Sequence, residues 1–182
     1  MDFVETPSHW LENFVWDPEF LQILGRHHTT GASISNQLVT QLRQSRNEFH
    51  AIERQNQILY ALFDQQIFGA PIPRDGDISK SIAISNTTDT FANLHREHGV
   101  PYADGTHWHS RFGHLVTYGA AYYGYLYSQV FAGDIWRHCF EGDSMSRQAG
   151  DRIWKTMLIH GGARDPHLML KELLGRRPRV DV

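Results

Sequence analysis

The amino-acid sequence predicts an all-α protein. Three observations lead to this class: apolar residues recur at the 3.6-residue period of a helix, helix-starting and helix-ending residues bracket these stretches, and no alternating run is long enough for a convincing strand. Residues 78–85 are a weak strand candidate. The 182 residues, of which 41% are hydrophobic and 12% aromatic, fit one globular domain with a sizeable core.

The first helix is expected to begin at Thr6. Thr6 suits the N-cap position and Pro7 suits the first helical position, where the missing amide of proline costs no hydrogen bond. Asp17 and Pro18 repeat this signal ahead of a second helix, which Gly25 ends. The further elements expected in this half are a loop over 26–33 and helices near 35–47 and 50–68.

Two glycines and two prolines over 69–76 predict a connector within the domain. The elements expected after it are a helix near 87–98 capped by Asn86 or Thr87 and stopped by Gly99, a largely irregular stretch over 100–119, a long buried helix over 120–141, and amphipathic helices over 144–160 and 165–174.

The charge and cysteine content exclude several classes of partner. A formal net charge of −3 without a basic cluster beyond residues 175–179 gives no electrostatic reason to expect nucleic acid or a membrane surface. No apolar run approaches the roughly 18 residues of a membrane span. The single Cys139 cannot form an internal disulfide, which favours a reducing compartment and an inert, buried thiol.

Twelve histidines make a metal site the first chemical hypothesis. The pairs His27–His28, His95–His98 and His107–His109 lack a third ligand close in sequence, so solvated histidines are the alternative interpretation. The pattern H-E-x-x-H, which sets two zinc ligands and a general base on one helical face, does not occur. The sequence therefore shows no self-contained zinc site.

A second candidate site lies over residues 113–125, which contain one histidine, four tyrosines and three glycines. Phenol and imidazole donors stabilise a developing oxyanion, and glycines permit close backbone approach. The alternative is a core helix whose tyrosine rings pack while each hydroxyl finds a backbone partner. Residue periodicity leaves both interpretations open.

Glu5, beside the first helix start, is a third candidate. An acidic residue there is ordinarily favourable for the helix dipole. Zinc enzymes with an H-E-x-x-H helix complete their ligand set with a carboxylate from a later helix. Glu5 has this role only if two histidines come from elsewhere.

Two segments resemble the thimet oligopeptidase, neurolysin and mitochondrial intermediate peptidase family of zinc metallopeptidases. The first is Asp2-Phe3-Val4-Glu5-Thr6-Pro7-Ser8, followed by Leu11-Glu12-Asn13-Phe14, and the second is Phe112-Gly113-His114-Leu115-Val116-Thr117-Tyr118-Gly119-Ala120-Ala121-Tyr122-Tyr123-Gly124-Tyr125-Leu126. The spacing from His114 to Tyr118 is similar to that of the mitochondrial intermediate peptidase branch.

The resemblance implies roles for individual residues. It makes Glu5 the third zinc ligand, and it makes His114, Tyr118 and Tyr125 the donors that face the substrate and its oxyanion. Gly113, Gly119 and Tyr122 become substrate-binding residues. The glycines would let this loop close, although they also suit close helix packing.

The resemblance also implies what surrounds the chain. Residues 1–182 are expected to be the C-terminal part of a catalytic domain, a fragment, with the H-E-x-x-H helix and the N-terminal half of the same polypeptide lying before residue 1. The complete form is expected to be a zinc metalloendopeptidase that holds one Zn²⁺ and cleaves oligopeptides or presequence intermediates. The expected location is the mitochondrial matrix by branch, otherwise the cytoplasm.

The chain by itself is expected to bind no zinc and to be inactive, because zinc sites need three or four protein ligands. The alternative is a non-catalytic helical module that binds a peptide or a protein. A histidine-rich metal-binding protein is a third class, which stoichiometric metal bound by the isolated chain would favour.

Overall fold

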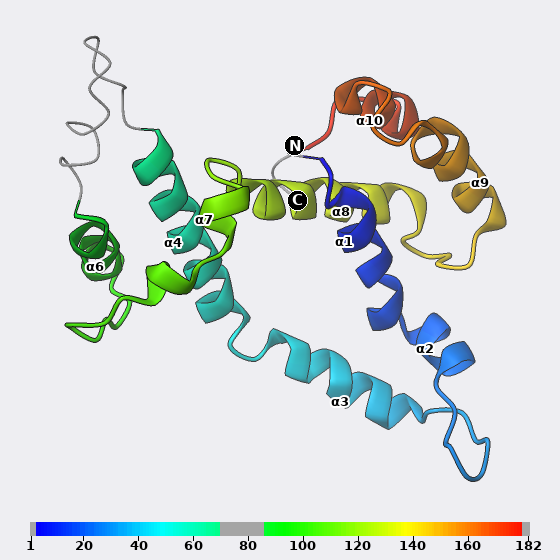
Figure 1. Ribbon diagram of the computed structural model, residues 1–182. Coiled ribbons are helices and arrows are strands. Elements are labelled where there is room, and N and C mark those ends of the chain that lie inside the picture. Colours follow the sequence, from blue (N-terminus) through cyan, green and yellow to red (C-terminus); the bar gives the residue numbers. More distant parts are fainter. Residues whose placement is uncertain (1–2, 70–85, 180–182) are drawn as a thin grey trace. The chain divides into compact units, whose positions relative to one another are not determined.

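The computed structural model describes residues 3–69 and 86–179, and every regular element in these ranges is a helix (Figure 1). An isolated antiparallel bridge joins Arg26 and Ser33, and no strand forms in the described ranges. The all-α prediction is therefore confirmed. The strand candidate at 78–85 and nearly all of the connector at 69–76 lie outside the described residues.

The chain divides into two compact units. The first comprises Met1–His50 with Gly124–Val182, and the second comprises Ala51–Tyr123. The assignment of residues 1–182 to one domain stays a prediction. None of the described helices is both long and apolar enough to cross a bilayer.

Four helices occupy the first 68 residues, with a 3₁₀ turn between two of them. They are α1 (Thr6–Glu12), η1 (Phe14–Trp16), α2 (Pro18–Leu24), α3 (Asn36–Asn47) and α4 (His50–Phe68). The side chain of Asp17 accepts a hydrogen bond from the Phe20 amide at 3.0 Å and so caps α2, as expected. Thr6 is not the cap of α1, because Glu5 already has helical dihedral angles and takes the N-cap position.

The helices that follow are shorter than the sequence patterns suggest. They are α6 (Thr87–Glu97), η2 (Trp108–Arg111), α7 (His114–Thr117), α8 (Tyr123–Cys139), α9 (Arg147–Thr156), η3 (Leu158–His160) and α10 (Pro166–Leu174). Ala120, the expected start of the long helix, has a φ of +60°, so helical geometry begins only at Tyr123. Met157 has a φ of −129° and separates α9 from η3, which ends the helix expected to run to His160.

Each unit has its own hydrophobic core. In the first unit α8, α9 and α10 enclose Ile135, Ile153 and Leu170, none of which is exposed. Burial of one such side chain stabilises the fold by roughly 1.5–3 kcal/mol. In the second unit Phe63 of α4 packs edge-on against Phe91 of α6, at 4.9 Å between ring centroids. The core of the first unit thus holds α8, and the core of the second unit holds α4.

Candidate active site

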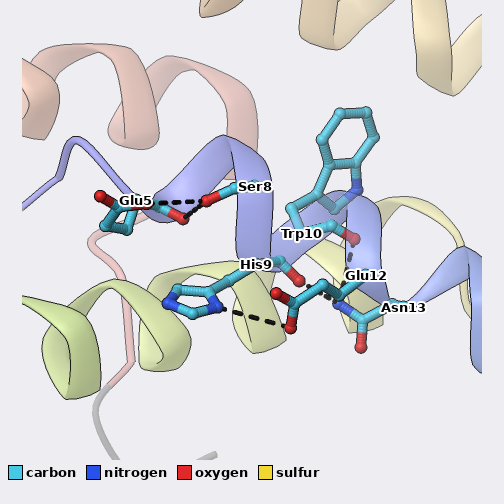
Figure 2. A network of polar contacts seen from close by, with 6 residues as sticks. All are labelled: Glu5, Ser8, His9, Trp10, Glu12 and Asn13. Carbon is cyan, nitrogen blue, oxygen red and sulfur yellow. Dashed lines mark hydrogen bonds and ion pairs between the residues drawn. The ribbon is translucent and has the colours of Figure 1, made fainter.

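Glu5 caps the N-terminus of α1 and is half-buried (Figure 2). The hydroxyl of Ser8 donates to Glu5 Oε2 at 3.0 Å and to the Glu5 backbone oxygen at 2.8 Å. The other carboxylate oxygen, Oε1, accepts no hydrogen bond from the described residues. Glu5 is thus a half-buried carboxylate with one oxygen held by Ser8 and the other without a hydrogen-bond partner among the described residues.

The polar side of α1 continues with His9 and Glu12, one and two turns beyond Glu5. His9 Nδ1 lies 3.5 Å from Glu12 Oε2, and the Asn13 side chain donates to the backbone oxygens of His9 and Trp10 at 3.1 Å each (Figure 2). The opposite side of α1 is apolar, since the Trp10 ring packs on Phe14 and Phe140 in the core of the first unit.

Several buried polar atoms on α1 have no hydrogen-bond partner among the described residues. They are Thr6 Oγ1, Trp10 Nε1 and both ring nitrogens of His9, of which Nδ1 has only the 3.5 Å ion-pair contact with Glu12. Unpaired buried donors and acceptors are costly, so such a group requires a partner. Glu5 has the chemistry of a zinc ligand, but no group of three or more metal-binding side chains forms within 3–69 and 86–179. The carboxylate fits zinc as one ligand of a larger set.

His114, Tyr118 and Tyr122 come together around α7 in the second unit. The ring of His114 lies 6.5 Å from that of Tyr118 and 5.3 Å from that of Tyr122, between centroids. Tyr118 is 40% exposed, whereas Tyr122 is 8% exposed and donates its hydroxyl to Gln57 Oε1 at 2.7 Å. In this arrangement Tyr118 is accessible to solvent, while the buried ring of Tyr122 packs edge-on against His114.

The segment between α7 and α8 is held by α4, a support that sequence patterns did not reveal. Asp64 has no exposed surface, and its two carboxylate oxygens accept the backbone amides of Ala120 at 2.9 Å and Tyr122 at 3.0 Å. Gln65 donates to the Ala120 carbonyl oxygen at 3.0 Å. The sequence did contain a signal for this support: Asp64 lies within the helix expected over 50–68, and a carboxylate that is buried there needs hydrogen-bond partners from another segment.

The two glycines of the loop differ in their surroundings. A Cβ added to Gly119 would lie 2.8 Å from the Phe68 ring, whereas one added to Gly113 would meet no atom within 4 Å. Gly119 therefore permits close packing against α4, which favours the helix-packing interpretation of this glycine over the closing loop. For Gly113 the added Cβ meets open space.

Tyr125 lies on α8 and belongs to the first unit together with Glu5. His114, Tyr118 and Tyr122 belong to the second unit. The sequence-predicted site residues thus form two groups, one in each unit.

Of the three histidine pairs, His27–His28 is exposed in the first unit with its two rings stacked, whereas the second unit holds at least one histidine of each other pair through a neighbouring group. His95 Nδ1 lies 3.2 Å from the Pro101 oxygen, and His109 Nε2 lies 3.2 Å from Thr87 Oγ1. Burial lowers the pKa of His109, and the charge of His107 lowers it further. These contacts favour histidines that pack and hydrogen-bond within the aromatic cluster around Phe91.

Comparison with known proteins identifies relatives along the whole chain. The family model described as peptidase family M3 matches residues 1–182. The mitochondrial intermediate peptidase of Arabidopsis thaliana is 39% identical over 177 residues, which are 97% of this chain and 24% of that protein. The human protein of the same name is 37% identical over 181 residues, 99% of this chain and 24% of that protein.

The mitochondrial intermediate peptidase of Saccharomyces cerevisiae (strain YJM789) is 34% identical over 173 residues, 95% of this chain and 22% of that protein. The chain therefore spans about a quarter of the length of these relatives. The resemblance drawn from the two motifs is confirmed, and the chain belongs to peptidase family M3.

Proposed function

We propose that the complete protein is a zinc metalloendopeptidase that hydrolyses peptide bonds, with Glu5 as a zinc ligand. Membership of peptidase family M3 and the similarity to mitochondrial intermediate peptidases support this activity. The observation that carries the proposal is the geometry of Glu5, whose Oε2 accepts a hydrogen bond from Ser8 while Oε1 has no hydrogen-bond partner among the described residues. In protein metal sites, a carboxylate that ligates the metal is commonly hydrogen-bonded by a neighbouring residue.

Glu5 alone cannot hold zinc, so the other ligands have to come from elsewhere in the complete protein. Structural and catalytic zinc sites use three or four protein ligands, and the sequence of 182 residues contains no H-E-x-x-H pattern. We therefore infer that two histidine ligands and a glutamate general base come from another part of the complete polypeptide. For the same reason the isolated chain is proposed to be inactive and to hold no zinc.

Bound zinc supplies a water of lowered pKa and polarises the scissile carbonyl. The residues of this chain then bind and orient the peptide. Tyr118 and Tyr125 donate their hydroxyls, and His114 a ring N–H, to the carbonyl oxygen as it gains charge. Tyr122 holds the imidazole of His114 from behind. Gly113 and Gly119 complete the substrate-binding loop.

The substrates proposed for the complete protein are oligopeptides or presequence intermediates, and its proposed location is the mitochondrial matrix. Both rest on the names of the relatives. The rival function, a non-catalytic helical module that binds a peptide or protein, is separated from the peptidase by the zinc measurement below.

The zinc ligand is tested by metal content. The purified complete protein is expected to carry one zinc per chain, and Glu5→Gln is expected to lose most of it because the amide is a poor ligand for zinc. Glu12→Gln is the matched control: Glu12 lies on the same helix, its side chain is 59% exposed, and its substitution should retain the metal. A complete protein without zinc would contradict the proposal and favour the non-catalytic module, whereas a Glu5→Gln protein with full zinc would remove Glu5 from the ligand set.

The oxyanion donor is tested by kinetics. Tyr125→Phe in the complete enzyme is expected to lower kcat by about 10²–10³ with little change in KM, because the donated hydrogen bond strengthens only in the transition state. Tyr127→Phe, two residues further along α8 and packed against the core of the first unit, is the control and should keep kcat. An unchanged kcat in Tyr125→Phe would remove that role.

A further inference from the structure

A polar pocket of about 420 Å³ lies in the first unit, between the η1–α2 corner and α3. Asn13, Trp16 and Asp17 contribute one side, and α3 contributes the other. It is distinct from the environment of Glu5, because Asn13 follows the last residue of α1, a helix about 10 Å long, and Glu5 precedes its first.

Helix α3 turns polar side chains toward this pocket. Thr40, Arg43, Gln44 and Asn47 line it, at the i, i+3, i+4, i+7 spacing of one helical face. The apolar Leu38 and Leu42 of the same helix are 53% and 37% exposed. All four of these pocket-lining residues are exposed, so the pocket is an open groove and its α3 wall is a polar helical face that a ligand can reach.

Two arginines of α3, Arg43 and Arg46, line the pocket. The Arg46 guanidinium stacks over the Trp16 ring, 4.5 Å from its centroid, and burial and the charge of Arg43 both lower the pKa of Arg46, while the charge of Glu12 opposes them. Neither arginine has a salt bridge or a side-chain hydrogen bond within the described part of the chain.

The acidic side chain that lines the pocket, Asp17, forms no ion pair with either arginine among the described residues. Asp17 Oδ1 is occupied by the Phe20 amide at 3.0 Å and by the hydroxyl of Ser144 at 2.7 Å. Arginine forks bind carboxylates with two parallel hydrogen bonds, and stacking on an aromatic ring keeps such a fork planar and oriented. The pocket is therefore complementary to a carboxylate.

We propose that this pocket binds a carboxylate of a peptide through Arg43 and Arg46. A volume of 420 Å³ is far larger than a single carboxylate group and accommodates a residue or two of an attached chain. The amide side chains of Asn13, Gln44 and Asn47 match the hydrogen bonds of a peptide backbone, and Trp16 and Trp136 offer apolar walls. The choice of a peptide as the occupant rests on the proposed peptidase function; the carboxylate rests on the two arginines.

Direct binding to the 182-residue chain tests the inference, by calorimetric titration with three peptides. They are Ac-Ala-Phe-Glu-Ala-NH₂, Ac-Ala-Phe-Ala-Ala-OH and the neutral Ac-Ala-Phe-Ala-Ala-NH₂. Saturable binding of either acidic peptide but not of the neutral one is expected. The acidic peptide that binds identifies the source of the carboxylate as a side chain or a C-terminus.

Variants locate the binding. Arg43→Gln and Arg46→Gln are each expected to weaken it about tenfold or more, and Arg46→Lys to weaken it as well because the planar fork is lost. Arg147→Gln on α9, at a side chain that is 90% exposed, is the control and should bind like the parent. Equal binding of the neutral peptide, no saturable binding, binding of inorganic phosphate alone, or binding unaffected in Arg43→Gln would each overturn the inference. The assay involves neither zinc nor turnover, so its failure leaves the proposed peptidase untouched.

Discussion

Asp64 gives the most demanding test of how the substrate loop is held. Its carboxylate is fully buried and accepts two backbone amides, those of Ala120 and Tyr122. Ala120 has a φ of +60°, a conformation that costs a residue with a Cβ roughly 1–2 kcal/mol. The hydrogen bond that the Ala120 amide donates to Asp64 and the one that the Ala120 oxygen accepts from Gln65 offset that cost.

Asp64→Asn keeps the size of the side chain and replaces one acceptor oxygen with a donor. One of the two charge-assisted hydrogen bonds is lost, because the backbone amide of Ala120 or Tyr122 then faces the NH₂ group of the new asparagine. A hydrogen bond to a charged group contributes about 1.5–3 kcal/mol, so we expect a loss of about 2–3 kcal/mol in the free energy of unfolding. Asp104→Asn makes the same chemical change at a side chain that is 82% exposed and paired with Arg96, where about 0.5 kcal/mol or less is expected.

Urea unfolding measures the free-energy change, and amide hydrogen exchange locates it. The amides of Ala120 and Tyr122 are expected to exchange roughly 30-fold faster or more in Asp64→Asn than in the parent, from the same 2–3 kcal/mol. If Asp64→Asn costs no more than Asp104→Asn, or if those two amides exchange as before, then Asp64 does not hold this segment and the reasoning fails.

Two further predictions concern a buried ion pair and a loop glycine. Burial raises the pKa of Asp134, but hydrogen bonds and the charge of Arg176 outweigh it, so the pKa lies below its ordinary value. The ionised Asp134 therefore contributes to the free energy of unfolding above about pH 4, and this contribution is lost as pH falls through the lowered pKa of the folded state. Asp134→Asn should abolish that loss. If urea unfolding gives the parent and the variant the same dependence of stability on pH from pH 7 to pH 2, the prediction is wrong. Gly119→Ala should cost about 1–3 kcal/mol in thermal unfolding because its Cβ would lie 2.8 Å from Phe68, whereas Gly113→Ala should cost about 1 kcal/mol or less; equal effects would count against the packing role of Gly119.

Local signals predicted the helices well wherever a capping side chain acts on its own neighbours. Ser35, Asn86 and Asp165 each accept an amide two or three residues ahead, and the helices after them begin where the sequence places them, within a residue. The α8 helix departs from the pattern because its start depends on Asp64, which is more than fifty residues away in sequence. No local propensity contains that contact.

By itself the sequence determined the all-α class, the peptidase family and the candidate residues. Helical periodicity and the two motifs involve only residues that are close together in the chain, so they can be recognised without the fold. The tertiary structure alone decided how those residues are held. It showed that Ser8 fixes one oxygen of Glu5, that Asp64 of α4 anchors the segment before α8, and that Arg43 and Arg46 face a pocket. Burial and hydrogen bonding between residues distant in sequence set the energies of these contacts, and only the folded chain brings such residues together.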